Sequence, residues 1–424
     1  MGAAAVSGQE GSLQIVADTD TAVPGLPGAT FSSFGQLDGV DPAISGRNVV
    51  FGAFPTGIYG WLDGELRVIA NLSSTFPGTG NPLGFDLFFG SSPSISGQNV
   101  AFACRNGRPG PGAICAYING QLESIALSAV TLVPGSTETF GTFFMLDGAS
   151  PSISGRNVAF VGSSASLNGV YARIDGELVT IADNNTPVPG QPGLTFLNFG
   201  QLSGASPSIS GANVAFFGVW SGGGGVYARI NDELRLIADT TTTGIGGVNP
   251  SISGENVAFL GSAGIYGYIN GKLRVIADAN TQIPGSNLVF TGFPINPTIS
   301  GENVAFVAGA DDLGVTVIGI FASIADGIEI VASERTVVPG HDDTTFSGFF
   351  WVDGVRPAIS EENVVFTARG RLPGQQKQFV TGVYARIVDP EIPTISRWGV
   401  VLLALPVVLA AAILIRRRLT VSAK

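Results

Sequence analysis

A ten-residue phrase recurs seven times along this chain of 424 residues and constrains the fold more than any other feature. It reads Pro-x-Ile-Ser-x-x-Asn-Val-x-Phe, and every copy keeps every fixed position. The copies begin at Pro42, Pro93, Pro151, Pro207, Pro250, Pro297 and Pro357. Their intervals of 43 to 60 residues suit one four-stranded blade of a β-propeller with loops of variable length.

The third repeat shows how one blade is built. Ser-Gly-Arg-Asn and Asp-Gly are turn sequences with the backbone freedom that tight hairpins require, and they separate segments rich in β-branched and aromatic residues. The predicted strands are residues 152–154, 158–162, 169–174 and 178–182. One repeat therefore corresponds to four strands.

The two ends of the repeat region complement each other. Residues 11–18 (GSLQIVAD) match the fourth strand of other repeats, such as 176–183, but no first three strands precede them. The seventh repeat stops after its third strand, at 382–387. We therefore expect strand 13–17 to complete the last blade and close the ring, which removes exposed sheet edges. The sequence predicts an all-β fold, a seven-bladed β-propeller over residues 1–390.

Composition agrees with this fold and limits the partners. Sixty Gly and 25 Pro residues accompany many β-branched ones, a profile typical of turn-rich β proteins. Five of the 21 basic residues and one of the 32 acidic residues lie after residue 390, so the remainder carries a net charge of −15. Nucleic acid is excluded as a partner because phosphate binding needs a basic surface.

Loop lengths predict where function lies. In an antiparallel blade, the loop between strands two and three emerges on the same side as the link to the next blade. Those segments are long and varied, whereas the other two turns are short. We therefore expect any ligand, an unknown glycan or protein, on this loop-rich face.

The phrase resembles the repeat of TolB-type (PD40/WD40-like) propellers. Ile252 stands where that family commonly has Trp, and no Asp precedes Gly254. The matching residues of the fifth repeat are Pro250, Ser253, Gly254, Val257, Ala258, Phe259, Ile265 and Tyr266. The resemblance implies the propeller fold and no site residue.

The last segment, 391–424, has a different character. An uncharged stretch at 400–415 follows the sequence IPTISRWG and precedes three arginines. About 17 apolar residues are just enough to cross a bilayer, so we predict one transmembrane helix at 399–415, with the arginines on the cytoplasmic side.

This segment resembles the bacterial IPTL-CTERM sorting signals. Ile395 replaces the usual Leu, and Arg397 stands where an acidic residue is frequent. The matching residues are Ile392, Pro393, Thr394, Ile395, Trp398, Gly399, Arg416, Arg417 and Arg418. The resemblance implies export, recognition by an exosortase-like enzyme, and a propeller held at the cell envelope on the outer side of the inner membrane.

An exported body needs a leader, and the first nine residues have neither a basic segment nor an apolar run. We expect an in-frame start upstream of Met1. The alternative is a cytoplasmic tail-anchored protein.

Candidate chemistry is sparse. With His341 as the one histidine, neither a Ser-His-Asp relay nor a multi-histidine metal site is expected, and no catalytic residue or cofactor is assigned. A weak cation site could form on the loop-rich face, where carboxylates could bind a hard cation; the alternative is a solvated acidic loop. Its candidate ligands are His341, Asp342, Asp343, Asp311 and Asp312.

Cys104 and Cys115 lie at facing ends of two predicted paired strands, around a ten-residue loop. A disulfide is expected in an oxidising compartment, and two buried thiols are the alternative.

Two other repeated features are expected to be structural. Pairs of Phe three residues apart in the links, such as Phe140 and Phe143, should form small cores rather than an aromatic rim. The Asn of each copy should bond to the backbone of its own turn rather than form a polar ring. These residues are Asn48, Asn99, Asn157, Asn213, Asn256, Asn303 and Asn363.

The sequence thus favours an exported, noncatalytic binding or structural module. The rival is a secreted hydrolase or lyase acting on polysaccharide, which would need carboxylates at one level on several blades. The repeated strands offer none at equivalent positions.

Replacing Pro393, Trp398 and Gly399 together by alanine tests the sorting signal. We expect the variant to stay in the membrane fraction but to lose its processed form, because the apolar span is unchanged. Immunoblots of fractionated cells measure both. Unaltered processing would contradict the sorting role and leave a plain anchor.

Overall fold

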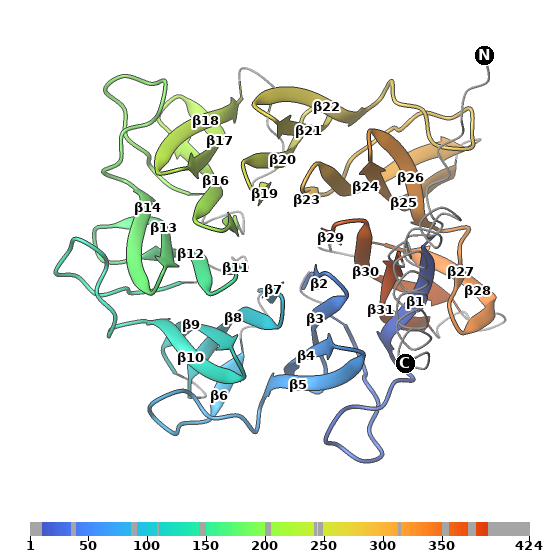
Figure 1. The fold of residues 1–424 in the computed structure, drawn as a ribbon, viewed down its shortest axis with the longest axis horizontal. Coiled ribbons are helices and arrows are strands. Elements are labelled where there is room, and N and C mark those ends of the chain that lie inside the picture. The colour runs from blue at the N-terminus through green and yellow to red at the C-terminus, as the bar shows by residue number, and fades with distance from the viewer. Residues whose placement is uncertain are drawn as a thin grey trace, which may run out of the picture. The chain divides into compact units, whose positions relative to one another are not determined.

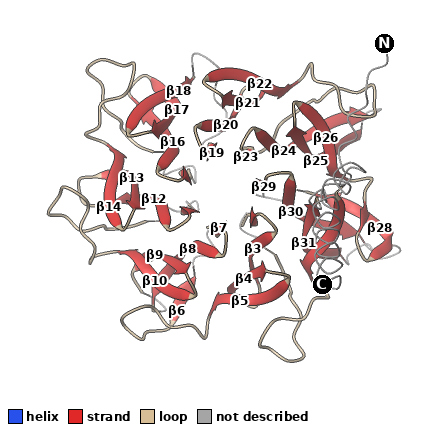
Figure 2. Ribbon diagram, viewed as in Figure 1, coloured by secondary structure: helices blue, strands red, loops and turns tan. Residues whose placement is uncertain are grey.

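Seven antiparallel sheets surround a central axis, one for each copy of the phrase (Figure 1). The computed structural model describes residues 11–34, 40–85, 91–107, 110–143, 150–199, 205–240, 244, 249–312, 315–349, 356–371 and 379–388. Within these residues the regular structure is all strand (Figure 2). The body Gly11–Ile387 is one unit. The predicted all-β, seven-bladed propeller is therefore confirmed.

Each blade starts with a three-residue strand beside the axis. The first blade contains β2 (Ala43–Ser45), β3 (Asn48–Ala53), β4 (Gly57–Leu62) and β5 (Glu65–Asn71). The second contains β7 (Ser94–Ser96), β8 (Asn99–Asn106), β9 (Gly112–Ile118) and β10 (Gln121–Leu127), with β6 (Leu83–Phe85) added beside β8. The third contains β11 (Ser152–Ser154), β12 (Asn157–Ser163), β13 (Asn168–Ile174) and β14 (Glu177–Asp183), each within one residue of its predicted bounds.

The remaining blades repeat the pattern. The fourth contains β15 (Ser208–Ser210), β16 (Asn213–Trp220), β17 (Gly223–Ile230) and β18 (Glu233–Asp239). The fifth contains β19 (Ser251–Ser253), β20 (Asn256–Gly261), β21 (Gly264–Ile269) and β22 (Lys272–Asp278). The sixth contains β23 (Thr298–Ser300), β24 (Asn303–Asp312), β25 (Val315–Ile324) and β26 (Gly327–Ser333). The seventh contains β29 (Ala358–Ser360), β30 (Asn363–Arg371) and β31 (Phe379–Ile387), joined by β27 (Val337–Val338) and β28 (His341–Gly348) from the link.

The N-terminal strand completes the seventh blade, as expected. Strand β1 (Ser12–Asp18) pairs antiparallel with β31, with Ser12 opposite Ile387 and Asp18 opposite Gly382. Its bulge between Ile15 and Ala17 recurs between the last two strands of every other blade. The ladder gives β31 a partner on its outer edge, so the ring closes without covalent continuity at this point.

The Ser and Asn of the phrase join neighbouring blades. Each Ser Oγ accepts a hydrogen bond from the N–H of the residue after the equivalent Ser in the next blade, at 2.8–2.9 Å. Each Asn Nδ2 donates to the carbonyl of that same residue, at 2.8–3.0 Å. Both sets run through all seven blades, so the phrase forms two closed hydrogen-bonded rings.

The expectation that each Asn bonds within its own turn was wrong. In six blades the Asn Oδ1 accepts from the N–H of the turn between strands three and four, as from Asp175 to Asn157 at 2.9 Å. One amide therefore bridges both short turns of its blade and the next blade. The short turns form one side of the ring, here called the turn face. This polar ring is structural.

Aromatic side chains from the links form the core between the blades. The first Phe of a link packs edge-on against the strand-three ring of the following blade, with centroids 4.8–4.9 Å apart in five blades. In blade three, a Cβ at Gly162 would lie 2.8 Å from the Phe140 ring, so this close approach requires glycine. The Phe pairs are buried except Phe293, which is half-buried. They form link cores, as expected.

The predicted transmembrane helix 399–415 and all nine sorting-signal residues lie outside the described residues. Among the residues that are described, none belongs to a helix long and apolar enough to cross a membrane.

Asn213→Ala tests the inter-blade clamp. Removing the amide deletes bonds to Gly254 and to the N–H of Asn231, so we expect a loss of about 1–2 kcal/mol in unfolding free energy. Asn185→Ala is the matched control, because Asn185 is exposed and its side chain makes no hydrogen bond with described residues. Urea unfolding compares the two, and equal midpoints would refute the clamp.

Candidate functional site

A cavity of about 120 Å³ lies on the axis, where the first strands begin. This is the end of the channel that opens to the loop-rich face. Its walls are the Pro of six phrases, most of the residues on either side of these prolines, and Thr298 from the remaining phrase. The lining residues are Asp41, Pro42, Ala43, Ser92, Pro93, Ser94, Ser150, Pro151, Ser152, Ser206, Pro207, Ser208, Pro250, Ser251, Thr298, Arg356, Pro357 and Ala358.

A third set of hydrogen bonds follows part of this mouth. The residue before each Pro is polar, and in Ser92, Ser150, Ser206 and Asn249 its side chain accepts from the backbone N–H of the equivalent residue one blade earlier. Asp41 N–H donates to Ser92 Oγ at 2.7 Å, Ser92 to Ser150 at 2.7 Å, and Ser150 to Ser206 at 2.8 Å. The series continues from Ser206 to Asn249 at 2.5 Å. Each of these Ser hydroxyls therefore acts as an acceptor at the mouth.

An ion pair extends this series across the seam between blades seven and one. Arg356 N–H donates to Asp41 Oδ1 at 2.6 Å, and its Nε donates to Oδ2 at 3.1 Å. Burial raises the pKa of Asp41 above its ordinary value, while the charge and hydrogen bonds of Arg356 act in the opposite direction. The side chains are 22% and 18% exposed, so the pair lies at the edge of solvent.

These mouth residues were missed by reasoning from the sequence. The repeated phrase begins at Pro, and the position before it is not identical among the copies, being Asp, Ser, Asn or Arg. Extending each copy backwards by one residue would have shown that all seven carry a polar side chain there. The arrangement can bind a small polar group. Its lining brings one carboxylate to the mouth, and Arg356 engages both of that carboxylate's oxygens.

The links expose apolar side chains. Six of the seven links each present at least one large aliphatic side chain that is more than two-fifths exposed. These residues, here called the apolar rim, are Leu26, Leu72, Val130, Leu132, Leu197, Val289 and Val337. Leu132 and Val337 occupy the same position, one residue after a Thr and two before Pro-Gly.

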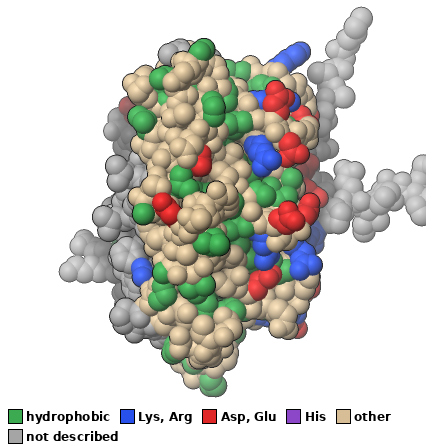
Figure 3. Space-filling model, turned by 90° about the vertical axis from the view of Figure 1, so that its left-hand side faces the viewer, with side chains coloured by type: hydrophobic (Ala, Val, Ile, Leu, Met, Phe, Trp, Pro, Cys, Tyr) green, Lys and Arg blue, Asp and Glu red, His purple; other side chains and the backbone are tan. Residues whose placement is uncertain are grey.

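Charge is distributed differently. In the side view of Figure 3, charged side chains gather toward one edge of the blades, and neutral and hydrophobic side chains cover much of the rest. Many of the charged residues lie in the turns between strands three and four and just after them, as with Glu65 and Arg67 or Glu233 and Arg235. The turn face is therefore the charged one.

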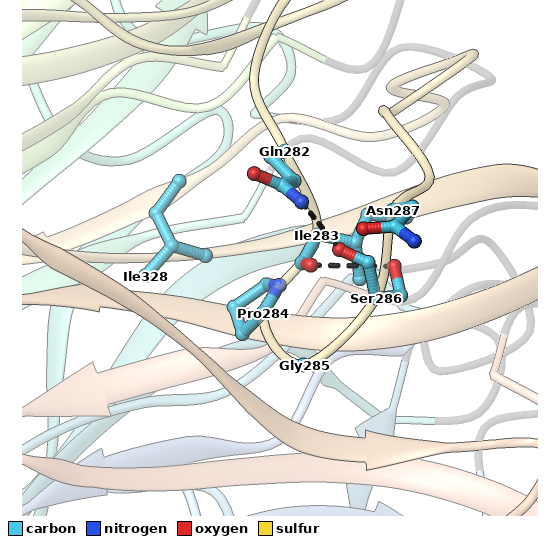
Figure 4. Close-up of a pocket in the computed structure, with 7 residues that line it drawn as sticks. All are labelled: Gln282, Ile283, Pro284, Gly285, Ser286, Asn287 and Ile328. Atoms are coloured by element: carbon cyan, nitrogen blue, oxygen red, sulfur yellow. Dashed lines mark hydrogen bonds between the residues drawn. The ribbon is translucent and has the colours of Figure 1, made fainter.

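A second hollow lies on the link between blades five and six (Figure 4). It measures about 570 Å³ and is lined by residues 282–287 and Ile328. Gln282 Nε2 donates to the Ser286 carbonyl at 2.5 Å, which closes the small loop. The lining contains no charged residue, so these residues include no acid, base or metal ligand.

The predicted cation ligands do not come together. Asp311, Asp342 and Asp343 are exposed, and the side chain of Asp312 lies outside the described residues. Within the described part, the one group of three potential metal ligands is His341 with Asp18 and Asp20. Among the described side chains, His341 meets Asp18 and Asp20 at the end of β1 and does not group with Asp311, Asp342 or Asp343.

Around this group several polar atoms are buried. His341 Nε2 lies 3.6 Å from Asp18 Oδ2 and 3.9 Å from Asp20 Oδ2. Burial, and then the charges of Asp18 and Asp20, raise the pKa of the Tyr384 hydroxyl well above its ordinary value. The hydroxyls of Tyr171, Tyr227 and Tyr384 are buried without a hydrogen-bond partner among the described residues.

Cys104 and Cys115 are joined by a disulfide between β8 and β9, with Cα atoms 5.9 Å apart and both side chains buried. They stand where blade three has Gly162 and Tyr171, and Leu83 stands where its link has Phe140. The disulfide thus fills the space that aromatic rings occupy in other blades.

No protein-family model and no curated protein matches the sequence. Solved structures similar to this chain include a prolyl endopeptidase, 10% identical over 84% of this chain and 51% of its own, with a TM-score of 0.38. The chain thus spans about half the length of that enzyme. The polysaccharide lyase Uly1 is 11% identical over 90% of this chain and 100% of its own, with a TM-score of 0.37. The Dos1 propeller is 14% identical over 84% and 77%, with a TM-score of 0.32. These similarities assign no activity to this chain.

A double-mutant cycle tests the ion pair at the mouth. Arg356→Met keeps the backbone bond to Asp41 Oδ1 but leaves a partly buried carboxylate without its guanidinium partner, so we expect a loss of about 1–3 kcal/mol in unfolding free energy. Asp41→Asn keeps Oδ1 as an acceptor, and combining it with Arg356→Met should recover part of that loss. Urea unfolding of the four proteins gives the coupling energy. Strict additivity would show that the pair contributes nothing.

Proposed function

We propose that this chain is an exported, membrane-anchored, noncatalytic propeller whose loop-rich face binds a protein of the cell envelope. The observation that carries the proposal is the apolar rim, because six links with different sequences each expose an aliphatic side chain. Exposed aliphatic side chains gathered on one face mark protein or membrane contacts. Single exposed residues scattered over a surface would carry no such meaning.

Two further features support a protein ligand. The Phe pairs that could have formed a platform for sugars are almost all buried, so the links present Leu and Val instead. The turn face is occupied by charged side chains and by two hydrogen-bonded rings. The link residues can vary without disturbing those rings, which suits a face that selects a partner.

The proposed location in the cell envelope depends on the C-terminal segment. The resemblance of residues 392–418 to an envelope sorting signal supports export and anchoring, and the disulfide between Cys104 and Cys115 suits an oxidising compartment. The alternatives are a secreted hydrolase or lyase acting on polysaccharide and a cytoplasmic tail-anchored protein. Each gives a different result in the experiment below.

The experiment combines location and binding. Protease added to intact spheroplasts should digest the propeller, and purified protein should bind envelopes from cells that lack the gene. The variant Leu132→Ser/Val337→Ser should lose about tenfold in affinity, which corresponds to about 1.4 kcal/mol. Val275→Ser is the matched control, because Val275 is comparably exposed but lies on outer strand β22.

Three outcomes would overturn the proposal. A body protected in spheroplasts would place it in the cytoplasm. Equal losses of affinity in the rim and control variants would show that any exposed aliphatic residue contributes to binding and that the apolar rim has no special role. Depolymerisation of an envelope polysaccharide by the purified protein would make it an enzyme.

A further inference from the structure

One cluster combines an imidazole with two carboxylates, and neither the hydrogen-bonded rings nor the apolar rim uses it. Its donor atoms, His341 Nε2, Asp18 Oδ2 and Asp20 Oδ2, all lie within 4.8 Å of one another. Asp18 ends β1, and Asp20 follows it in the turn. His341 begins β28, more than 300 residues away in the sequence. The cluster therefore joins the N-terminal strand β1 to the link before blade seven, which is here called the closing blade.

Comparison with the other blades shows that these ligands are peculiar to the closing blade. Each outer strand ends in a turn, and the third residue of that turn is Asn185 in blade three and Asn280 in blade five, where the closing blade has Asp20. The residue after Pro-Gly is Gln191 in the link that covers blade four, where the closing blade has His341. Both substitutions replace an amide by a metal-binding group.

Asp18 itself follows the repeated pattern. Its Oδ1 accepts from the Thr21 hydroxyl at 2.7 Å and from the Asp20 N–H at 3.1 Å, as the Asp183 and Asp278 oxygens do in their own turns. The turn thus uses Oδ1, while Oδ2 faces His341. The second oxygen remains for a ligand.

A buried hydroxyl also points to a missing partner. Tyr384 is fully buried, and its Oη has no hydrogen-bond partner among the described residues. A Cβ at Gly382 would lie 2.9 Å from Asp18 Cβ and 3.1 Å from Tyr384 Cζ, so the end of the Tyr384 ring lies beside Asp18. Tyr171 and Tyr227 have similar hydroxyls, but their blades lack the imidazole. Among the described blades, the closing one has this hydroxyl beside an Asp that also faces an imidazole.

We propose that Asp18, Asp20 and His341 bind a divalent transition-metal ion of the Zn²⁺ type and that this ion holds the ring closed. Two carboxylate oxygens and one imidazole nitrogen suit zinc or manganese, whereas calcium prefers oxygen donors alone. Tetrahedral zinc holds its ligand atoms about 3.4 Å apart, so separations of 3.6 and 3.9 Å need only small side-chain movements. The ion ties β1 to the link that covers blade seven.

The test uses the full chain, purified in detergent and stripped of metal with a chelator. Isothermal titration with Zn²⁺ should show one tight site per chain, and Ca²⁺ should bind at least tenfold more weakly. Hydrogen exchange of the β1 and β31 amides should slow at least tenfold with Zn²⁺, because the ion fixes one end of the closing ladder.

Each variant replaces a proposed ligand by the residue that another blade has at the corresponding position. His341→Gln and Asp20→Asn install residues that other blades already carry, so both should fold with a metal-free Tm close to that of the parent. Each should lose the Zn²⁺ site and the slowed exchange. Asp342→Asn/Asp343→Asn is the matched control, since it removes two neighbouring exposed carboxylates and should change neither readout.

The outcomes are distinguishable. No stoichiometric Zn²⁺ binding, or binding that survives His341→Gln, overturns the site. Binding that depends on His341 but leaves exchange of the closing ladder unchanged overturns the proposed role in closure. Loss of binding in the control variant would place the metal on the exposed aspartates instead.

Discussion

The structure depends on one repeated interaction, the pair of hydrogen bonds that each phrase sends to the next blade. A Ser hydroxyl accepts from one N–H, and an Asn amide donates to the carbonyl of that same residue, so one residue per blade is held from both sides. Such bonds each contribute about 1 kcal/mol, but they fix the rotation between blades at seven identical points. Hydrophobic packing between blades is less directional, so these bonds determine how each blade sits beside the next.

This constraint divides the molecule into two unlike faces. The Ser and Asn of these turns cannot be replaced without breaking a ring, and the turn face accordingly repeats them in every blade. Five links supply a Phe that covers the next blade, as Phe196 covers Tyr227, and the rest of each link is free to differ. Variation of sequence, exposed aliphatic residues and the channel mouth therefore occur on the same side.

The same division explains what the sequence could predict. Strand number, turn positions and the completing strand follow from local patterns, and the structure reproduces them within a residue in the third blade. The partner of each Asn was not predictable from its turn, because it lies 41 to 58 residues away in the first six blades. His341 was assigned to neighbouring aspartates for a related reason: its contacts depend on the strand onto which the link folds, and that strand comes from the other end of the chain.

Ring closure leaves a seam where only noncovalent contacts join blade seven to β1 and the first blade. Two groups of charged residues lie at this seam, one at the channel mouth and one at the outer edge. At equivalent positions around the mouth other blades use a Ser or Asn acceptor, but the seam uses the Arg356 and Asp41 pair. At the outer edge, Asp20 stands where blades three and five have Asn185 and Asn280, and His341 stands where the link over blade four has Gln191. A covalent link tolerates weak neighbouring contacts because the blades cannot separate, whereas a seam opens if its contacts are weak. Charge-assisted interactions at the seam are therefore what an open chain needs in order to behave as a closed ring.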